Sequence, residues 1–356
     1  MKKPNPTNKR ILELEAEVSA LRAESRDNLK KLEALKKKSA IFQAIAEEVK
    51  SVVKPLTPLP AQKVCKKGHT EDVVMHLSDE HFDEIVLPET VQNLENYNFT
   101  IACARAEKYV NTVLELTQST LSSYSFENLW ILAYGDHTSG ELHGGVQRSA
   151  YKNMFKNVLA GGQLHALMFR DLAPYFKNIH CVYVPGNHGR RTPKKDYHGA
   201  HDNWDYLLAE VAKLHCRDIK NVHFTIPNSF AVNVNIRNHV FAVEHGDDVQ
   251  SWNSIPYYGL ERKSRRLSAL HANQGLNIHC NVYGHFHQPS MLSGLAGTET
   301  IINGSWKATD PFVYGKFSGY TVPHQWLHGV HDKQGITWRY RINLLGSETP
   351  ERYIIA

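Results

Sequence analysis

Five short apolar runs, each followed at once by polar side chains, limit what this chain can fold into more than any other feature. The runs are DVVMHL (72–77), NLWILAY (128–134), CVYVP (181–185), HVFAVE (239–244) and IHCNVY (278–283). Such runs are typical of buried β-strands. Helical patterns separate them, at 102–118, 147–170, 203–215 and 256–272. This order of elements predicts a layered α/β fold.

The residues that follow the five runs belong to types that bind metals. They are Asp79 and His81, Gly135-Asp136, Gly186-Asn187-His188, His245, and Gly284-His285-Phe286-His287. Because sites in α/β sheets lie outside the carboxyl ends of the strands, we expect these residues to converge. A pair of divalent cations about 3.5–4 Å apart needs a bridging carboxylate, with imidazole and oxygen donors around each cation. The sequence supplies all three kinds of donor.

Local geometry adds two expectations. If residues 284–287 are extended, the side chains of His285 and His287 lie on one side and reach neighbouring metals. Glycines precede Asp136, Asn187 and His285. We expect these glycines to allow sharp turns from strand to loop.

Cysteine usage and apolar content exclude several classes of protein. The five cysteines are scattered and have no CxxC spacing, which indicates neither a disulfide framework nor a thiolate zinc site. No run of about 18 apolar residues is present, and the first ten residues, MKKPNPTNKR, lead into a charged segment. We therefore expect a cytoplasmic protein with no membrane partner.

In its five blocks, the chain resembles the calcineurin-like metallophosphoesterases over residues 72–305. That family has the ordered pattern DxH, GD, GNH plus an acid, a lone His, and GHxH; the matching blocks here lie at 79–81, 135–136, 186–188, 245 and 284–287. The protein phosphatases of the superfamily carry GDxxDRG and GNHE, which GDHTSGEL and GNHGRR do not match. In style the chain is nearest to phage and bacterial phosphoesterases described as DNA repair exonucleases. The resemblance therefore implies a bacterial or phage-infected host cell.

The resemblance implies a four-layer α/β/β/α sandwich and two divalent metal ions. Mn²⁺ is the first expectation, with Fe, Zn, Ni or Mg as alternatives. One metal would take Asp79, His81 and His287, the other Asn187, His245 and His285, and Asp136 would bridge them. His188 would bind no metal. It would face the scissile phosphate, stabilise charge and protonate the leaving oxygen, while the nucleophile attacks in line from the opposite side.

The chain departs from the family pattern at Gly189, where an Asp or Glu usually orients the histidine. Either another carboxylate replaces it, with Glu80, Asp202 and Asp205 as candidates, or His188 is a weaker acid. His137 and His143, beside the second block, either line the pocket or are surface residues.

A basic loop follows the third block. We expect Arg190, Arg191, Lys194 and Lys195 to bind substrate phosphates, since arginine grips phosphate with two hydrogen bonds and lysine attracts it as a point charge. The alternative is a solvated loop.

The N-terminal segment carries the chain's excess positive charge. Residues 1–70 hold 16 Lys and Arg against 8 Asp and Glu, a net +8 within a total of +5. The apolar residues of this segment recur at three- and four-residue spacing, with Ser25, Asn28 and Ser39 at the same spacing: Ile11, Leu14, Val18, Leu21, Leu32, Leu35 and Phe42. About five heptads of this kind predict a two- or three-stranded coiled coil, and the alternative is one amphipathic helix lying on the main domain.

The expected domains are a basic coiled-coil oligomerisation helix (1–54), a proline-containing linker (55–70) and a metallophosphoesterase domain (71–356). We predict two-metal phosphodiester hydrolysis by a homo-oligomeric DNA nuclease, acting as an exo- or endonuclease. One alternative is a phosphodiesterase for cyclic nucleotides or other small molecules. A non-catalytic DNA-binding or scaffold protein with a relict site is a second alternative, which the intact ligand set disfavours.

Overall fold

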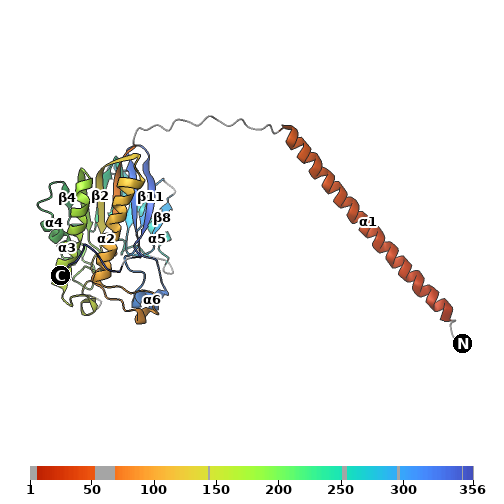
Figure 1. Ribbon diagram of the computed structural model, residues 1–356, viewed down its shortest axis with the longest axis horizontal. Coiled ribbons are helices and arrows are strands. Elements are labelled where there is room, and N and C mark those ends of the chain that lie inside the picture. Colours follow the sequence, from red (N-terminus) through yellow and green to blue (C-terminus); the bar gives the residue numbers. More distant parts are fainter. Residues whose placement is uncertain are drawn as a thin grey trace. The chain divides into compact units, whose positions relative to one another are not determined.

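The computed structural model describes residues 6–52, 69–142, 145–250, 255–294, 297–346 and 348–355. The chain divides into two compact units, Met1–Cys65 and Lys66–Ala356. The first unit contains the long helix α1 (Pro6–Val52) (Figure 1). The side chains from residue 14 to residue 41 are all exposed. Most of the predicted linker, up to residue 68, lies outside the described residues. None of the described helices is long and apolar enough to cross a membrane.

The second unit contains two mixed β-sheets. The first sheet has the strand order β11-β10-β1-β2-β3-β4. Within it β1 to β4 run parallel, β10 pairs antiparallel with β1, and β11 pairs antiparallel with β10. Its strands are β1 (His69–Leu77), β2 (Tyr124–Tyr134), β3 (Asn178–Val184), β4 (Val222–Thr225), β10 (His324–His331) and β11 (Gly335–Asn343).

The second sheet has the order β5-β6-β7-β9-β8. Its central strands β6, β7 and β9 run parallel, and the edge strands β5 and β8 pair antiparallel with their neighbours. The strands are β5 (Ala231–Ile236), β6 (His239–Glu244), β7 (Ile278–Tyr283), β8 (Ser290–Ser293) and β9 (Glu299–Ile302).

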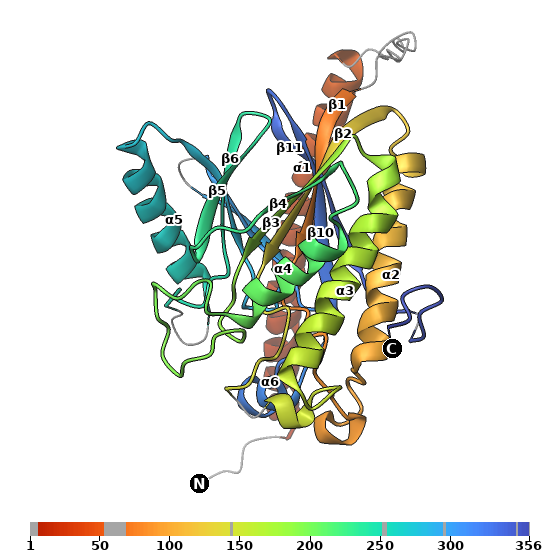
Figure 2. The same cartoon turned by 90° about the vertical axis from the view of Figure 1, so that its left-hand side faces the viewer.

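Helices cover both outer faces of the paired sheets. In Figure 2, α2 (Phe99–Glu115), α3 (Met154–Leu172) and α4 (Trp204–His215) lie on one side and α5 (Tyr257–Ala272) on the other. Side chains of β1 alternate between two cores: Val73 and Met75 pack with residues of α2, α3 and α4, while Val74 packs with residues of the second sheet. The predicted four-layer α/β/β/α sandwich is therefore confirmed. A short helix, α6 (Pro311–Phe317), follows β9.

The predicted strands are present, and two predicted helices begin elsewhere. α2 starts at Phe99 because the side chain of Asn98 accepts a hydrogen bond from the backbone N–H of Ile101, and Asn153 caps α3 in the same way. Residues 147–153, predicted to be helical, instead form the end of a 3₁₀ turn and a loop. The remaining strands, β4, β5, β8, β9, β10 and β11, were not predicted.

Candidate metal centre

The loops that carry the five blocks are joined to one another by backbone hydrogen bonds. The N–H of Asp79 donates to the carbonyl of Gly135 over 3.0 Å, and the N–H of His81 donates to the carbonyl of Asp136 over 3.1 Å. The N–H of His285, in the second sheet, donates to Oδ1 of Asp79 over 2.9 Å. These bonds gather the carboxyl ends of β1, β2 and β7 at one place.

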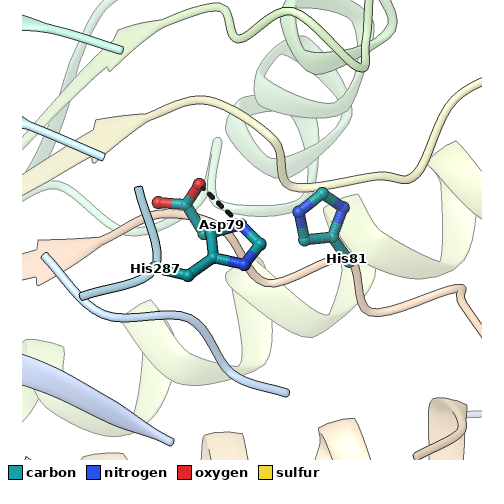
Figure 3. Close-up of side chains that lie close together, drawn as sticks. All are labelled: Asp79, His81 and His287. Carbon is teal, nitrogen blue, oxygen red and sulfur yellow. Dashed lines mark ion pairs between the residues drawn. The ribbon is translucent and has the colours of Figure 1, made fainter. Parts of the chain in front are cut away.

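Three groups of possible metal ligands lie here, and within each group the ligand atoms are within 4.8 Å of one another. The groups are Asp79-His81-His287, His81-Asp136-His188 and Asp136-His245-His285. Figure 3 shows the first group, in which Nε2 of His287 lies 3.4 Å from Oδ1 of Asp79. Because His81 and Asp136 each belong to two groups, the three groups form one continuous cluster.

Asn187 completes the cluster on the side of the second sheet. Nε2 of His245 lies 2.9 Å from Oδ2 of Asp136 and 3.1 Å from Oδ1 of Asn187. Nδ1 of His245 lies 2.8 Å from the carbonyl oxygen of Tyr134, which orients the ring. The structure thus brings together all seven side chains predicted as metal ligands.

The surroundings of the His81 ring indicate whether these residues fit a metal ion. Its Nε2 is buried and has no hydrogen-bond partner within the part of the chain that the structure describes. A buried polar atom without a partner is costly, and a cation would satisfy it. Imidazole and carboxylate ligands suit zinc, iron and manganese. The residues therefore fit a site for divalent cations.

The backbone is left-handed at five of the predicted ligands. Their φ angles are positive: 53° at Asp79, 41° at His81, 53° at Asp136, 66° at His285 and 57° at His287. This region costs about 1–3 kcal/mol for a residue with a side chain and persists only where its surroundings hold it in place. Such outliers cluster at functional sites, which supports a common role for these five residues.

The expectation of an extended segment at 284–287 is wrong. The left-handed backbone at His285 and His287 makes this segment a turn. His285 joins the group with His245, and His287 joins the group with Asp79. The two histidines therefore reach different groups, but not by the alternation of an extended strand.

The glycines of the loops are required more by the lack of room for a Cβ atom than by a special backbone conformation. A Cβ atom on Gly186 would lie 2.2 Å from Oδ1 of Asp136, and one on Gly284 would lie 2.5 Å from Oδ2 of Asp79. Among the three predicted turn glycines, Gly135 is the one with a positive φ, 88°. At the other two positions the missing side chain makes room for a carboxylate.

The charges of the cluster are coupled. Burial would raise the pKa of the Asp136 carboxyl, but the imidazoles of His245 and His188 hold it well below its usual range. Burial lowers the pKa of His245, and the Asp136 carboxylate overcomes this effect and raises it to about 10. For His285, burial and the charge of His245 lower the pKa to about 4. Without a cation, His285 is thus neutral at physiological pH and His245 is protonated, so a cation bound to His245 would displace its proton.

His188 lies at the exposed side of the cluster. Its Nε2 is 4.0 Å from Oδ2 of Asp136 and its side chain is 30% exposed. The backbone N–H of His188 donates to Oδ1 of Asp136 over 2.7 Å, and Nδ1 lies 3.3 Å from the carbonyl oxygen of Ser139. An Nδ1–H that donates to Ser139 leaves Nε2 directed toward the site.

The three candidate carboxylates have other roles. Glu80 bonds to His137 and His165, and Asp202 pairs with Arg191. Asp205 accepts the backbone N–H groups of three loop residues, Asp136, His137 and Gly186. Each carboxylate therefore acts in a part of the structure other than the orientation of His188.

Gly189 is explained by crowding. A Cβ atom there would lie 2.2 Å from Oδ1 of Asn203 and 3.0 Å from Oδ2 of Asp205. The residues at the start of α4 thus occupy the space that an acidic side chain at 189 would need.

A second buried group was missed by the sequence analysis. Glu80, His137 and His165 form a further set with ligand atoms within 4.8 Å of one another. Oε2 of Glu80 lies 2.8 Å from Nδ1 of His137 and 2.9 Å from Nε2 of His165. Nδ1 of His165 lies 2.8 Å from the hydroxyl of Tyr183. His137 is buried and not on the surface, and His143 lies outside the described residues.

The basic loop is partly neutralised. Arg191 pairs with Asp202 over 2.8 Å and lies over the ring of Trp204, 5.7 Å from its centroid. Lys195 pairs with Asp247 over 2.7 Å and lies 4.6 Å from the centroid of Phe230. Arg190 is half-buried, and Lys194 is exposed. Two of the four predicted substrate-binding cations therefore have carboxylate partners.

Comparison with known proteins gives a structural likeness only. No family model and no curated protein matches the sequence. Among solved structures, similar ones include Vps29 with bound zinc from Entamoeba histolytica, with 12% identity over 77% of this chain and 99% of that one and a TM-score of 0.33. A predicted phosphoesterase from Streptococcus pneumoniae shows 8% identity over 77% and 98%, with a TM-score of 0.29. A 5′-nucleotidase from Candida albicans shows 10% identity over 81% and 54%, with a TM-score of 0.36. Likenesses this weak do not establish a family for the chain.

Proposed function

We propose that this protein hydrolyses phosphodiesters with two divalent metal ions, and that its substrate is DNA. The observation that carries the proposal is the carboxylate of Asp136, which is grouped with His81 of one proposed ligand set and with His245 and His285 of the other. Asp79, His81 and His287 would hold one cation, Asn187, His245 and His285 the other, with Asp136 between them. When bound, the cations would polarise the phosphate and lower the pKa of the attacking water.

His188 would act as the acid in this reaction. A proton on Nε2 passes to the leaving oxygen while Nδ1–H remains bonded to the Ser139 carbonyl, 3.3 Å away. A carbonyl thus takes the orienting role that an acidic neighbour would otherwise have.

Aromatic and basic side chains near the ligand loops support a nucleic-acid substrate. Phe155 is 64% exposed and makes an edge contact with Trp204, over which Arg191 lies. Tyr197 is 66% exposed and lies next to Lys195. Bases stack on aromatic side chains for about 1–3 kcal/mol each, while cations hold the backbone. Arg190, Arg191, Lys194 and Lys195 would supply those cations.

A small phosphodiester is the second candidate. The ion pairs Arg191–Asp202 and Lys195–Asp247 reduce the positive charge that the loop offers to a polyanion. A cyclic nucleotide, with a single phosphate, needs fewer cations than DNA does.

Hydrolysis assays with Mn²⁺ test the proposal. Linear, circular and single-stranded DNA are compared with cyclic nucleotides and a nitrophenyl phosphodiester. We expect DNA cleavage, and we expect Asp136→Asn to abolish turnover on every substrate and to lower the bound metal. The control Asp202→Asn removes an exposed carboxylate and keeps metal content and turnover on the nitrophenyl ester. Near wild-type turnover of Asp136→Asn at saturating Mn²⁺ would contradict the two-metal assignment.

The choice of substrate is tested separately. Phe155→Ala with Tyr197→Ala is expected to weaken single-stranded DNA binding and to leave the nitrophenyl ester unaffected. Tyr175→Ala is the matched control, because Tyr175 is half-exposed and precedes β3, at the end opposite to the ligand loops. Cleavage of cyclic nucleotides with no cleavage of DNA would favour the second candidate.

A further inference from the structure

The helix α1 exposes a long apolar seam. Leu14, Val18, Leu21, Leu32 and Leu35 are between 44% and 64% exposed. They occupy two of the seven heptad positions, called a (18, 32) and d (14, 21, 35), which face the partner helix in a coiled coil. The two apolar stretches of this seam, 14–21 and 32–35, are separated by Ser25 and Asn28, and each needs another surface to cover it.

The charged residues beside the seam differ between the two halves of the helix. These are positions e and g, which flank the seam on either side. In the first half they are acidic, Glu15, Glu17 and Glu24, with Arg22 as the exception. In the second half they are basic, Lys31, Lys36 and Lys38. All of these side chains are exposed, and Lys31 forms an exposed ion pair with Asp27 one turn away.

A parallel pair of such helices places like charges together. In that arrangement a g residue meets the e residue five positions later in the other helix. Glu17 then faces Arg22, which is favourable, but Lys31 faces Lys36, and Glu24 faces Leu29. The second half of the seam would be repulsive.

An antiparallel pair places opposite charges together at three flanking contacts, and at the fourth Arg22 faces Leu29. With Val18 opposite Leu35 of the second copy, Glu17 faces Lys38 and Glu24 faces Lys31. On the other flank Glu15 faces Lys36. Symmetry repeats each contact, and the polar seam residues Ser25 and Asn28 then face each other.

We propose that α1 forms a two-stranded antiparallel coiled coil with α1 of a second copy of this chain. A helix of 47 residues is about 70 Å long at 1.5 Å per residue. The C-terminal ends of the two helices would then lie at opposite ends of a coiled coil of about that length. This inference does not depend on the proposed hydrolysis.

Cysteine crosslinking of the full chain tests the orientation. Val18→Cys and Leu35→Cys are made as separate proteins and oxidised alone and as a mixture. In the antiparallel dimer, residue 18 faces residue 35, so the disulfide-linked dimer forms in the mixture and not with either variant alone. Crosslinking of Val18→Cys with itself would show a parallel pair, and a monomeric wild-type protein would also overturn the proposal. The wild type is the control for the native cysteines, of which Cys103, Cys181, Cys216 and Cys280 are buried.

Charge reversal gives a second test that leaves the apolar seam intact. Lys31→Glu with Lys38→Glu sets acidic residues against Glu24 and Glu17 in the antiparallel dimer, and we expect the dissociation constant to rise at least about tenfold. In a parallel dimer the same variant would relieve the contact between residues 31 and 36 and bind more tightly. The matched control is Lys30→Glu with Lys37→Glu, one position away on the outer face. Adding Glu17→Lys and Glu24→Lys to the first variant should restore the dimer, and failure to restore it would overturn the proposal.

Discussion

At the scale of single residues, His188 is fixed through its backbone and through one ring nitrogen. Its N–H donates to Asp136, and Nδ1 lies against the Ser139 carbonyl. The contact with Ser139 is lost with the imidazole, but the backbone N–H of His188 still donates to the carboxylate of Asp136. Replacing the ring should therefore leave the predicted metal ligands where they are.

We predict that His188→Ala keeps both metals and slows hydrolysis by about 10²- to 10⁴-fold, the range for a lost acid. The loss should be smaller for a nitrophenyl ester, whose leaving group needs no proton. Metal analysis and turnover on both esters check this. His198→Ala, at an exposed position ten residues later, is the control. An equal loss on both esters would assign His188 to charge stabilisation.

Glu80 links both ligand loops to the helix layer. It lies between Asp79 and His81 in sequence, and its carboxylate bonds to His137 and to His165 of α3. Burial would raise the pKa of Glu80, but the two histidines lower it to about 2. Burial would lower the pKa of His137, and the Glu80 carboxylate raises it instead.

We predict that Glu80→Gln lowers the free energy of unfolding by about 3 kcal/mol, as for a broken buried pair. Because the folded pKa of Glu80 is depressed, its contribution is present above the unfolded value of 4.5 and is lost as pH falls toward 2. Because the folded pKa of His137 is raised, its contribution is present below 6.5 and is lost as pH rises through the folded value. Urea titrations in EDTA should therefore show that the free energies of unfolding of Glu80→Gln and wild type differ most between about pH 4.5 and 6.5.

The control for this variant is Glu89→Gln, which changes an exposed carboxylate. If the difference in the free energy of unfolding between Glu80→Gln and wild type does not vary between pH 4 and pH 8, the assigned charges are contradicted.

The candidate site was largely predictable and its supporting residues were not. Asp79, Asp136 and His245 follow apolar runs directly, so position along the chain was enough to find them. Glu80 and His165 are among the supporting residues. Their roles depend on which faces of β1 and α3 are buried. A single sequence does not show how a helix face meets a strand end.

At the scale of elements, the start of α4 holds the loop that carries Asn187 and His188. Asn203 caps α4 by accepting the N–H of Asp205, and its side-chain amide donates to the carbonyl of Gly186 over 3.0 Å. Asp205 accepts the N–H of Gly186 over 2.9 Å. The start of α4 and the loop that carries Asn187 and His188 are therefore held together by these hydrogen bonds.

We predict that Gly189→Asp, which introduces an acid directly after His188, is harmful. Its Cβ would meet Asn203 at 2.2 Å. Overpacking of this kind costs about 1–3 kcal/mol, so thermal unfolding should occur at a lower temperature and turnover should fall. Gly315→Asp, in α6 with open space around it, is the control for adding the same side chain. Faster turnover of Gly189→Asp would show that the loop can shift to accept the acid.

The predicted elements were those with strong local signals. The runs that became β1, β2, β3, β6 and β7 are apolar because both faces of these strands are covered. The strand β11 is the edge of the first sheet, where several of its residues face solvent, and β10 lies between β11 and β1. The mixed composition of β10 and β11 carries no such signal, so the pairing of β10 with β1 and of β11 with β10 emerged from the structure alone.

At the scale of the whole molecule, the cores and the candidate site lie in one unit. Every residue in the hydrophobic clusters of the described chain belongs to Lys66–Ala356. The unit Met1–Cys65 contributes an exposed helix. Folding and assembly should therefore be separable.

We predict that deletion of residues 1–55 leaves a folded, metal-binding protein of lower oligomeric order. Circular dichroism and metal analysis check the fold, and light scattering gives the mass. The full-length protein is the control. An unchanged number of subunits would move oligomerisation to the Lys66–Ala356 unit, and an unfolded product would show that the helix is needed for folding.

The position of β1 in the first sheet has a consequence for synthesis on the ribosome. One neighbour of β1 is β2, which follows soon after it, but the other is β10, where Met75 pairs with Leu327. Until residue 331 has been made and released, one edge of β1 stays open to pairing with other chains. Slow elongation or early termination between β9 and β10 would therefore yield nascent chains that aggregate, although every predicted metal ligand has already been translated.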